Sequence, residues 1–233
     1  MVRLLRRGAR SLFRTSYPTG PVGELAAAPP APSRTPVHDV AFLAVDLETT
    51  GLDPRQDHVL AAGWVPVIDG EVVLRDAREV LVRPPAGVSV GESATIHGLT
   101  DDQLDHGSDL RDVLPELLEA LRGRVLVAHH APLELGFLGH AVRSVYGARL
   151  PVTAVDTMQL QHRLVVGPHG DVAPGALRLD AARRHFGLPR YAAHRASIDA
   201  IATAELLLAQ SAELAYRLGH EPTLGDLSPT HQH

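Results

Sequence analysis

The chain has 233 residues, of which 45% are hydrophobic and 21% are charged. This composition fits one globular domain with a substantial core and excludes a chain that is disordered throughout. The absence of cysteine excludes disulfide scaffolds, thiolate zinc sites and cysteine nucleophiles. The formal net charge of −5 does not fit wide nucleic-acid binding through a basic surface, so any such contact is expected to be local or metal-assisted.

Residues 1–40 show no sustained hydrophobic period and end in an Ala- and Pro-rich stretch that is typical of a linker. We predict a basic, flexible arm here, followed by one domain over residues 41–218. The Arg-rich, acid-free segment 1–17 has a second interpretation as an organelle transit peptide. Residues 219–233 are short, polar and Pro-containing, and they are predicted to form a frayed tail.

Three strands are predicted at the start of the domain, over residues 41–47, 59–68 and 72–82. Asp69 and Gly70 separate the second from the third, and an Asp-Gly pair between two apolar runs is a strong signal for a hairpin turn.

Helices and strands then alternate. Leucine and valine at helical spacing predict a helix over residues 110–121. A short buried strand over 125–128 leads to a helix that begins at Pro132, a residue favoured in a first helical turn. This order predicts an α/β domain with a mixed central sheet, three antiparallel strands and then parallel ones, flanked by helices. The remaining predicted helices cover 157–164, 177–186 and 196–218.

Two carboxylates occupy a strand in which apolar residues are expected. Strand alternation places Asp46 and Glu48 on one face, with Val45 and Leu47 on the other. Carboxylates at the end of a hydrophobic strand repel each other and lose hydration, and a cation would relieve both costs. The alternative is that the strand has already become a loop and both side chains are solvated.

Glu134 and Asp199 fall in the first turns of two predicted helices, where the helix dipole alone can account for an acid. His194 precedes the second of these helices and is expected in a loop near Asp199. Together the four carboxylates and the histidine provide what a two-metal phosphodiesterase site needs. Carboxylate oxygens suit Mg²⁺ or Mn²⁺, and a histidine can accept a proton from water near neutral pH.

Residues 41–213 resemble the DEDDh family of 3′–5′ exonucleases, and within it the proofreading (epsilon) subunit of bacterial DNA polymerase III. The first motif reads VDLETTGL over residues 45–52, and the third is His194 followed by Asp199. Shorter matches are IHGLT at 96–100 and VDT at 155–157. The resemblance implies a ribonuclease H-like fold and stepwise release of nucleoside 5′-monophosphates from a 3′ end.

The resemblance also implies roles for individual residues. His194 would be the general base toward the attacking water, and Asp46 would bridge a pair of Mg²⁺ or Mn²⁺ ions. Asp156 is assigned to a helix cap. The metal ligands would be Asp46, Glu48, Glu134 and Asp199. These four residues and His194 would be the catalytic residues. The residues that contact the substrate would be Leu47, Thr49, His97 and His130, with His97 near the 3′ hydroxyl.

The second motif departs from the family pattern, His-Asn-Ala-x-Phe-Asp, because this chain has HHAPLE at residues 129–134. The carboxylate of Glu134 remains, but its side chain is one methylene longer. Since Mg²⁺ demands near-ideal octahedral geometry, Mn²⁺ is expected to tolerate this change better. Our hypothesis is that Glu134 still binds metal.

Two classes of function compete. The first is an active metal-dependent exonuclease that acts on single-stranded ends. Similarity favours DNA as its substrate. An RNA-trimming enzyme is the alternative, because no residue is seen to require or exclude a 2′-hydroxyl. The second is a catalytically impaired module that binds nucleic acid or a polymerase. Retention of all four acids and His194 favours the enzyme.

The expected partner is the 3′ end of a single strand, and association with a DNA polymerase is possible. The residues after Leu218 contain no recognisable clamp-binding peptide, which favours a stand-alone enzyme or recruitment through residues 1–40. No apolar run approaches the roughly 18 residues of a membrane span, so no membrane partner and a cytoplasmic location are expected.

Overall fold

The structure is a computed structural model that describes residues 17–93, 97–166, 171–192, 194–227 and 230–231. Its strands are β1 (Phe42–Thr49), β2 (Val59–Ile68), β3 (Glu71–Val72), β4 (Arg78–Leu81), β5 (Val125–Ala128), β6 (Thr153–Asp156) and β7 (Thr230–His231). They form one sheet in the order β3-β2-β1-β5-β6-β7, and β4 also pairs with β2. β2 is antiparallel to β1, β3 and β4, whereas β5 runs parallel to β1 and β6, which confirms the predicted mixed α/β sheet.

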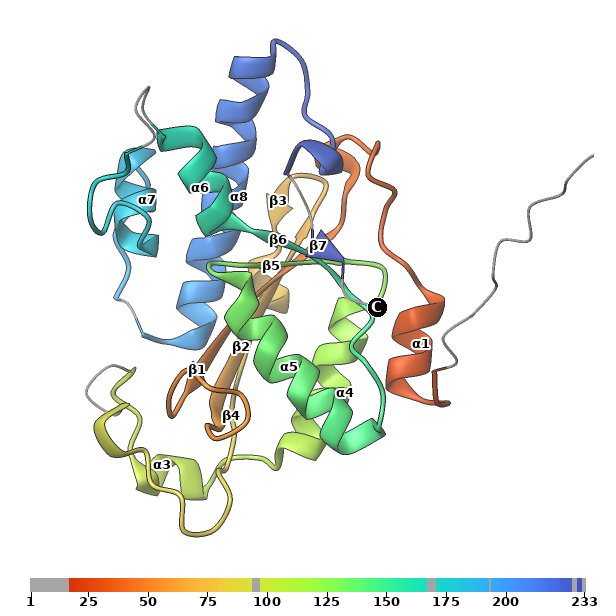
Figure 1. Ribbon diagram of the computed structural model, residues 1–233, viewed down its shortest axis with the longest axis vertical. Coiled ribbons are helices and arrows are strands. Elements are labelled where there is room, and N and C mark those ends of the chain that lie inside the picture. The colour runs from red at the N-terminus through yellow and green to blue at the C-terminus, as the bar shows by residue number, and fades with distance from the viewer. Residues whose placement is uncertain (1–16, 94–96, 167–170, 193, 228–229, 232–233) are drawn as a thin grey trace, which may run out of the picture.

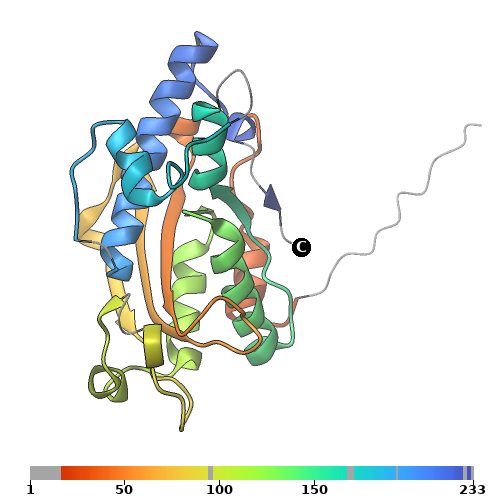
Figure 2. The same cartoon turned by 60° about the vertical axis from the view of Figure 1, so that its left-hand side comes forward.

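Helices cover both faces of this sheet (Figure 1). One face carries α1 (Pro21–Ala27), α4 (Leu110–Leu121) and α5 (Ala131–Tyr146). The opposite face carries α6 (Thr157–Val165), α7 (Leu179–His185) and α8 (Ala196–Leu218), as the turned view in Figure 2 also shows. The short α3 (Asp101–Asp105) lies at one end of the sheet (Figure 1). Short 3₁₀ helices cover Val37–Asp39, Leu74–Asp76, Gly91–Ser93 and Leu224–Leu227. Within the described residues, no helix combines the length and the apolar character that a membrane span requires.

The alternation of β1 divides the core into two clusters. Leu43, Val45 and Leu47 pack with α4 and α5, whereas Phe42 and Ala44 pack with α8. Asp46 and Glu48 follow Phe42 and Ala44 at intervals of two and therefore lie on the α8 face. The prediction that these two carboxylates share a face of a strand is confirmed.

The third predicted strand is wrong as one continuous element. Residues 72–82 divide into β3 and β4, which pair with different parts of β2 and are separated by the 3₁₀ turn Leu74–Asp76. The backbone N–H of Val73 donates to the carbonyl of Pro66 in β2, at 2.9 Å. Pro66 has no N–H with which to return this bond, so the ladder is interrupted at that point. The hairpin at Asp69 and Gly70 is confirmed, and both residues have positive φ.

Both predicted mobile ends are partly folded onto the domain. Val22 and Leu25 of α1 are buried against the α4 side, and Leu224 and Leu227 are buried on the α8 side. β7 then pairs with β6. The predicted flexible arm is therefore wrong for residues 17–40, and the predicted frayed tail is wrong for 219–227 and 230–231. These apolar residues stand in segments too short for a periodic signal. Residues 1–16 lie outside the described part of the chain.

Gly63 of β2 lets the start of α8 lie directly on the sheet. It pairs with Asp46 of β1 on one side and with Glu79 of β4 on the other, so the three residues form a row across three strands. A Cβ at Gly63 would lie only 2.1 Å from the carbonyl carbon of Ala196, the first residue of α8. The missing side chain is thus what permits this approach.

Gly63→Ala should destabilise the protein, because the new methyl group would overlap the backbone of α8. We expect the free energy of unfolding in urea to fall by about 1–3 kcal/mol or more, the usual cost of overpacking. Gly225→Ala is the matched control, since its Cβ would come no closer than 3.2 Å to a neighbouring atom. Equal effects of the two substitutions would contradict the assigned contact.

Candidate active site

Three of the predicted site residues converge where the end of β1 meets the start of α8. Glu48, His194 and Asp199 each offer one metal-ligating atom, and these three atoms all lie within 4.8 Å of one another. Glu48 comes from the end of β1, Asp199 from the first turn of α8, and His194 from the loop before α8. The sequence prediction that these groups share one place is consistent with this arrangement.

The loop before α8 is held by a contact between two of these residues. The backbone N–H of His194 donates to Oδ2 of Asp199 at 2.7 Å. His194 has a φ of +69°, in the left-handed region that histidine tolerates better than most residues. Its backbone is therefore fixed while its side chain stays exposed.

A fifth carboxylate, which the sequence analysis missed, anchors the start of α8 from the other side. Glu79 accepts a hydrogen bond from the backbone N–H of Ser197 at 3.1 Å, one from the Ser197 hydroxyl, and one from Arg195 at 3.2 Å. Burial opposes ionisation of Glu79, but these bonds keep its pKa below its ordinary value. An acid in a predicted strand was the available signal, as it was for Asp46.

The carboxylates near Gly63 disfavour one another's charge. Burial raises the pKa of Asp46 well above its ordinary value, and Glu134, Asp199 and Glu48 raise it further. Burial, together with Asp199 and Glu79, raises the pKa of Glu48 to about 7. The pKa of Asp199 is also raised, mainly by burial, although the N–H of His194 opposes the change. Ionising these carboxylates therefore costs free energy through lost hydration and mutual repulsion, and a bound cation would offset this cost.

Glu134 lies in the first turn of α5 and is only 2% exposed. Burial raises its pKa to about 8, and its Oε2 has no hydrogen-bond partner among the described residues. Its charge acts on Asp46, but its carboxylate does not belong to the group of Glu48, His194 and Asp199 that lies within 4.8 Å. The structure thus places Glu134 beside the acidic cluster with one oxygen unused.

His130 and Asp156 organise the backbone next to Glu134. His130 has a φ of +85°, and its N–H donates to Oδ1 of Asp156 at 3.1 Å. The same oxygen accepts the N–H groups of Met158 and Gln159, so Asp156 caps α6 as predicted. The side chain of His130 is exposed.

Two of the other predicted substrate contacts, Leu47 and Thr49, lie in different surroundings. Leu47 is buried in the core on the α4 and α5 side, and is not brought to the acidic cluster. Thr49 ends β1, and its hydroxyl donates to the carbonyl of Gly51 at 2.6 Å.

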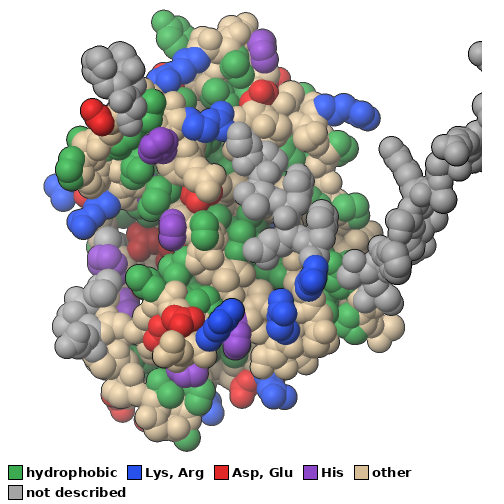
Figure 3. Space-filling model, in the orientation of Figure 1, with side chains coloured by type: hydrophobic (Ala, Val, Ile, Leu, Met, Phe, Trp, Pro, Cys, Tyr) green, Lys and Arg blue, Asp and Glu red, His purple; other side chains and the backbone are tan. Residues whose placement is uncertain are grey.

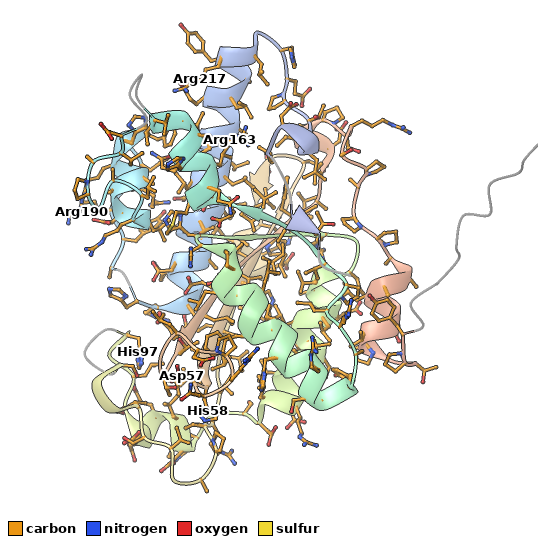
Figure 4. The ribbon with its side chains drawn as sticks, viewed as in Figure 1. Asp57, His58, His97, Arg163, Arg190 and Arg217 are labelled. Atoms are coloured by element: carbon orange, nitrogen blue, oxygen red, sulfur yellow. The ribbon has the colours of Figure 1, made fainter. Side chains whose placement is uncertain are left out.

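His97 is buried and lies near α3 (Figure 4). Its Nδ1 accepts the N–H of Leu99 at 3.1 Å, and its Nε2 lies 3.0 Å from Oγ of Ser93. Burial and the neighbouring His194 lower the pKa of His97, which favours its neutral form.

A cleft of about 730 Å³ opens over the cluster and continues along α7. Asp46, His194 and Asp199 line one part of it. Figure 3 shows acidic and histidine side chains together in a hollow at the left of the molecule. The sequence analysis missed the residues of the other wall, which include Arg178, Arg184, Arg190 and Tyr191.

Stability without metal should depend on pH through Glu134. In the folded protein its pKa is about 8, against an ordinary value of 4.5, so its stabilising contribution is complete below about pH 4.5 and is lost as the pH rises through 8. Glu134→Gln removes this loss. In EDTA we expect the melting temperature of the variant to exceed that of the wild type by about 3 °C or more at pH 9, but not at pH 5.

Glu71→Gln, at an exposed position of β3, is the control and should show no such pH dependence. A Glu134→Gln difference of the same size at both pH values would contradict the raised pKa.

Most of the sequence is similar to known exonucleases and DNA polymerase III proteins. A family model described as "Exonuclease", of the RNase T type, matches residues 43–207. DNA polymerase III subunit epsilon of Treponema pallidum is 30% identical over 185 residues, which cover 79% of this chain and 83% of the relative. DNA polymerase III PolC-type of Thermotoga petrophila is 32% identical over 170 residues, or 73% of this chain. The chain spans only 12% of the length of that relative.

Solved structures share the fold. Exonuclease X in complex with 5′ overhanging duplex DNA matches with a TM-score of 0.56 and 25% identity, covering 80% of this chain and 99% of that one. E. coli exonuclease I in complex with a dT13 oligonucleotide matches with a TM-score of 0.65 and 15% identity, covering 77% and 42% of the two chains. The predicted ribonuclease H-like fold is confirmed, and the chain belongs to the DEDD family of 3′–5′ exonucleases, with an epsilon-like domain.

Proposed function

We propose that this protein is a metal-dependent exonuclease that removes nucleotides from the 3′ end of single-stranded DNA and releases nucleoside 5′-monophosphates. The observation that carries the proposal is the convergence of Glu48, His194 and Asp199 within 4.8 Å. Asp46 interacts electrostatically with Glu48 and Asp199 of this group, and Glu134 interacts in turn with Asp46. The four carboxylates and the histidine that correspond to the family motifs therefore lie in one region of the fold, with Glu134 at the position where the family has Asp.

The residues present fit a pair of hard divalent cations. Their donors are carboxylate oxygens, which Mg²⁺ and Mn²⁺ prefer. One buried oxygen of Glu134 lacks a partner among the described residues, and the pKa values of all four acids are raised. When bound, such ions would neutralise charge on the scissile phosphate and make water more acidic. The ligands would be Asp46, Glu48, Glu134 and Asp199.

His194 would act as the general base. Its ring lies within reach of Glu48 and Asp199, and its backbone is held by Asp199, so an attacking water at the cluster could pass a proton to it. Asp199 would then serve both as a ligand and as the residue that fixes this loop. His97, held by hydrogen bonds with Ser93 and Leu99, would position the terminal nucleotide, with Thr49 and His130 as further contacts.

DNA is the proposed substrate because the relatives reported above are DNA polymerase III proteins and exonuclease X was solved with DNA. Because the match covers 99% of exonuclease X, we propose that the domain described here carries the catalytic activity by itself. An association with a DNA polymerase is the alternative that the epsilon relative suggests. An RNA-trimming activity of the same active site is the second candidate.

The direct test is mononucleotide release from 5′-labelled single strands of DNA and of RNA with the same sequence. We expect stepwise shortening from the 3′ end in Mg²⁺ or Mn²⁺, faster on DNA, and none in EDTA. Asp46→Asn should abolish it, because Asp46 interacts electrostatically with the other three proposed ligands, Glu48, Glu134 and Asp199. Faster cleavage of RNA would select the alternative substrate. A folded protein that binds DNA but releases nothing in either metal would contradict the enzyme.

His194→Ala should lower kcat by about 10²–10⁴-fold, the usual contribution of a general base, with little change in KM. Single-turnover cleavage at saturating enzyme would measure the chemical step. His162→Ala is the control, since His162 is exposed on α6 and does not line the cleft. A wild-type rate for His194→Ala would exclude His194 as the base.

A further inference from the structure

The cleft extends beyond the acidic cluster, and its second wall has no role in the chemistry proposed above. This wall is formed by α7 and by the segment between α7 and α8, over residues 188–191. Tyr191 stands in this segment and is 41% exposed. It is one of few large hydrophobic side chains that are exposed within the described residues, and it lines the same cleft as Asp46 and Asp199.

Tyr191 is exposed but firmly held. Its hydroxyl donates to Oε1 of Glu205 at 2.8 Å, and its ring lies 4.6 Å from the guanidinium of Arg183. Arg183 is itself only 4% exposed and donates to Glu205 at 2.8 Å, to the carbonyl of Ala202 at 2.7 Å and to that of Pro189 at 2.9 Å. A buried arginine with three hydrogen bonds thus fixes an aromatic ring at the surface of the cleft. A ring fixed in advance loses little conformational entropy when a ligand stacks on it.

Arginine side chains surround this ring. Arg178, Arg184 and Arg190 are exposed and line the same cleft. Arg184 is paired with Asp180 at 2.8 Å, whereas Arg178 and Arg190 form no ion pair among the described residues. Figure 3 shows arginine side chains at the upper edge of the hollow, and Figure 4 places Arg190 on the α7 side. In a chain with a net charge of −5, this local excess of positive charge faces the place where a polyanion would enter.

We infer that this wall binds the nucleotides adjoining the scissile one, with a base stacked on Tyr191 and phosphates contacted by Arg178 and Arg190. This inference rests on the proposed function, since it assigns the cleft to the substrate strand. Stacking on an aromatic ring requires an unpaired base and is indifferent to its identity. Tyr191 would therefore favour single strands over duplex ends without favouring any sequence.

The test for stacking is binding in EDTA, in which no hydrolysis takes place. Fluorescence anisotropy would measure the affinity for a labelled dT10 strand and for strands with one abasic residue at each of the last four positions from the 3′ end. For the wild type, we expect one of these positions to weaken binding about fivefold or more. Tyr191→Ala should weaken binding to dT10 by a similar factor. For this variant, the abasic residue at the same position should cause no further loss of affinity.

Two variants make this result specific to the ring. Tyr191→Phe keeps the ring and should retain most of the affinity and the abasic effect, even if Tyr191→Ala proves unstable. Tyr216→Ala removes a tyrosine that is 84% exposed near the other end of α8, and it should bind like the wild type. An equal abasic effect in wild type and Tyr191→Ala, or no abasic effect in the wild type, would overturn the stacking role.

The arginine contacts have a separate readout in the salt dependence of binding. Each phosphate contact to a single strand contributes about 0.7 to the slope of log affinity against log salt concentration. Arg190→Gln should lower the slope by about this amount, whereas Arg75→Gln, at an exposed position outside the cleft, should not. Unchanged slopes in both variants would overturn the role of Arg190. Because none of these measurements needs cleavage, failure of the inference and failure of the proposed activity are distinguishable.

Discussion

The site depends on how closely α8 can approach the central sheet. Gly63 stands between Asp46 and Glu79 in one row across three strands, and its missing side chain leaves room for the first residues of α8. The helix therefore begins between carboxylates on both sides. Its N-terminal N–H groups and the positive end of its dipole offset part of their repulsion. Without this approach, Asp199 would not reach the end of β1, and the acids could not act together.

Much of the fold could be predicted because the long elements carry strong periodic patterns. β2, α4, β5 and α8 have the bounds that the sequence indicated. The errors occur where a short local feature overrides the pattern. Pro66 interrupts the hydrogen-bond ladder that would have made residues 72–82 one strand. A few buried apolar residues are enough to attach residues 17–40 and the residues after Leu218 to the domain. Such contacts depend on tertiary structure and leave no period in the sequence.

The acids of the site could be predicted from their position, because a carboxylate at the end of an apolar strand needs an explanation. Glu79 is likewise a carboxylate in an apolar strand, but it was overlooked because residues 72–82 were predicted as one continuous strand. The cleft wall at Tyr191 could not be predicted, since it depends on Arg183 and Glu205 meeting across two helices. The altered second motif also becomes intelligible in the structure. His130 occupies a left-handed position, for which both asparagine and histidine are suited, so the replacement of the family's Asn preserves the backbone.

The short strand β7 has a consequence for the edge of the sheet. It pairs with β6, whose outer hydrogen-bonding groups would otherwise face solvent, while Leu224 and Leu227 cover the adjoining apolar surface. An uncovered strand edge is a template for pairing with another chain. A shortened chain that ended at Gly219 would expose this edge and the apolar surface together. The last described residues therefore protect the enzyme against self-association, although they lie far in sequence from every residue of the cleft.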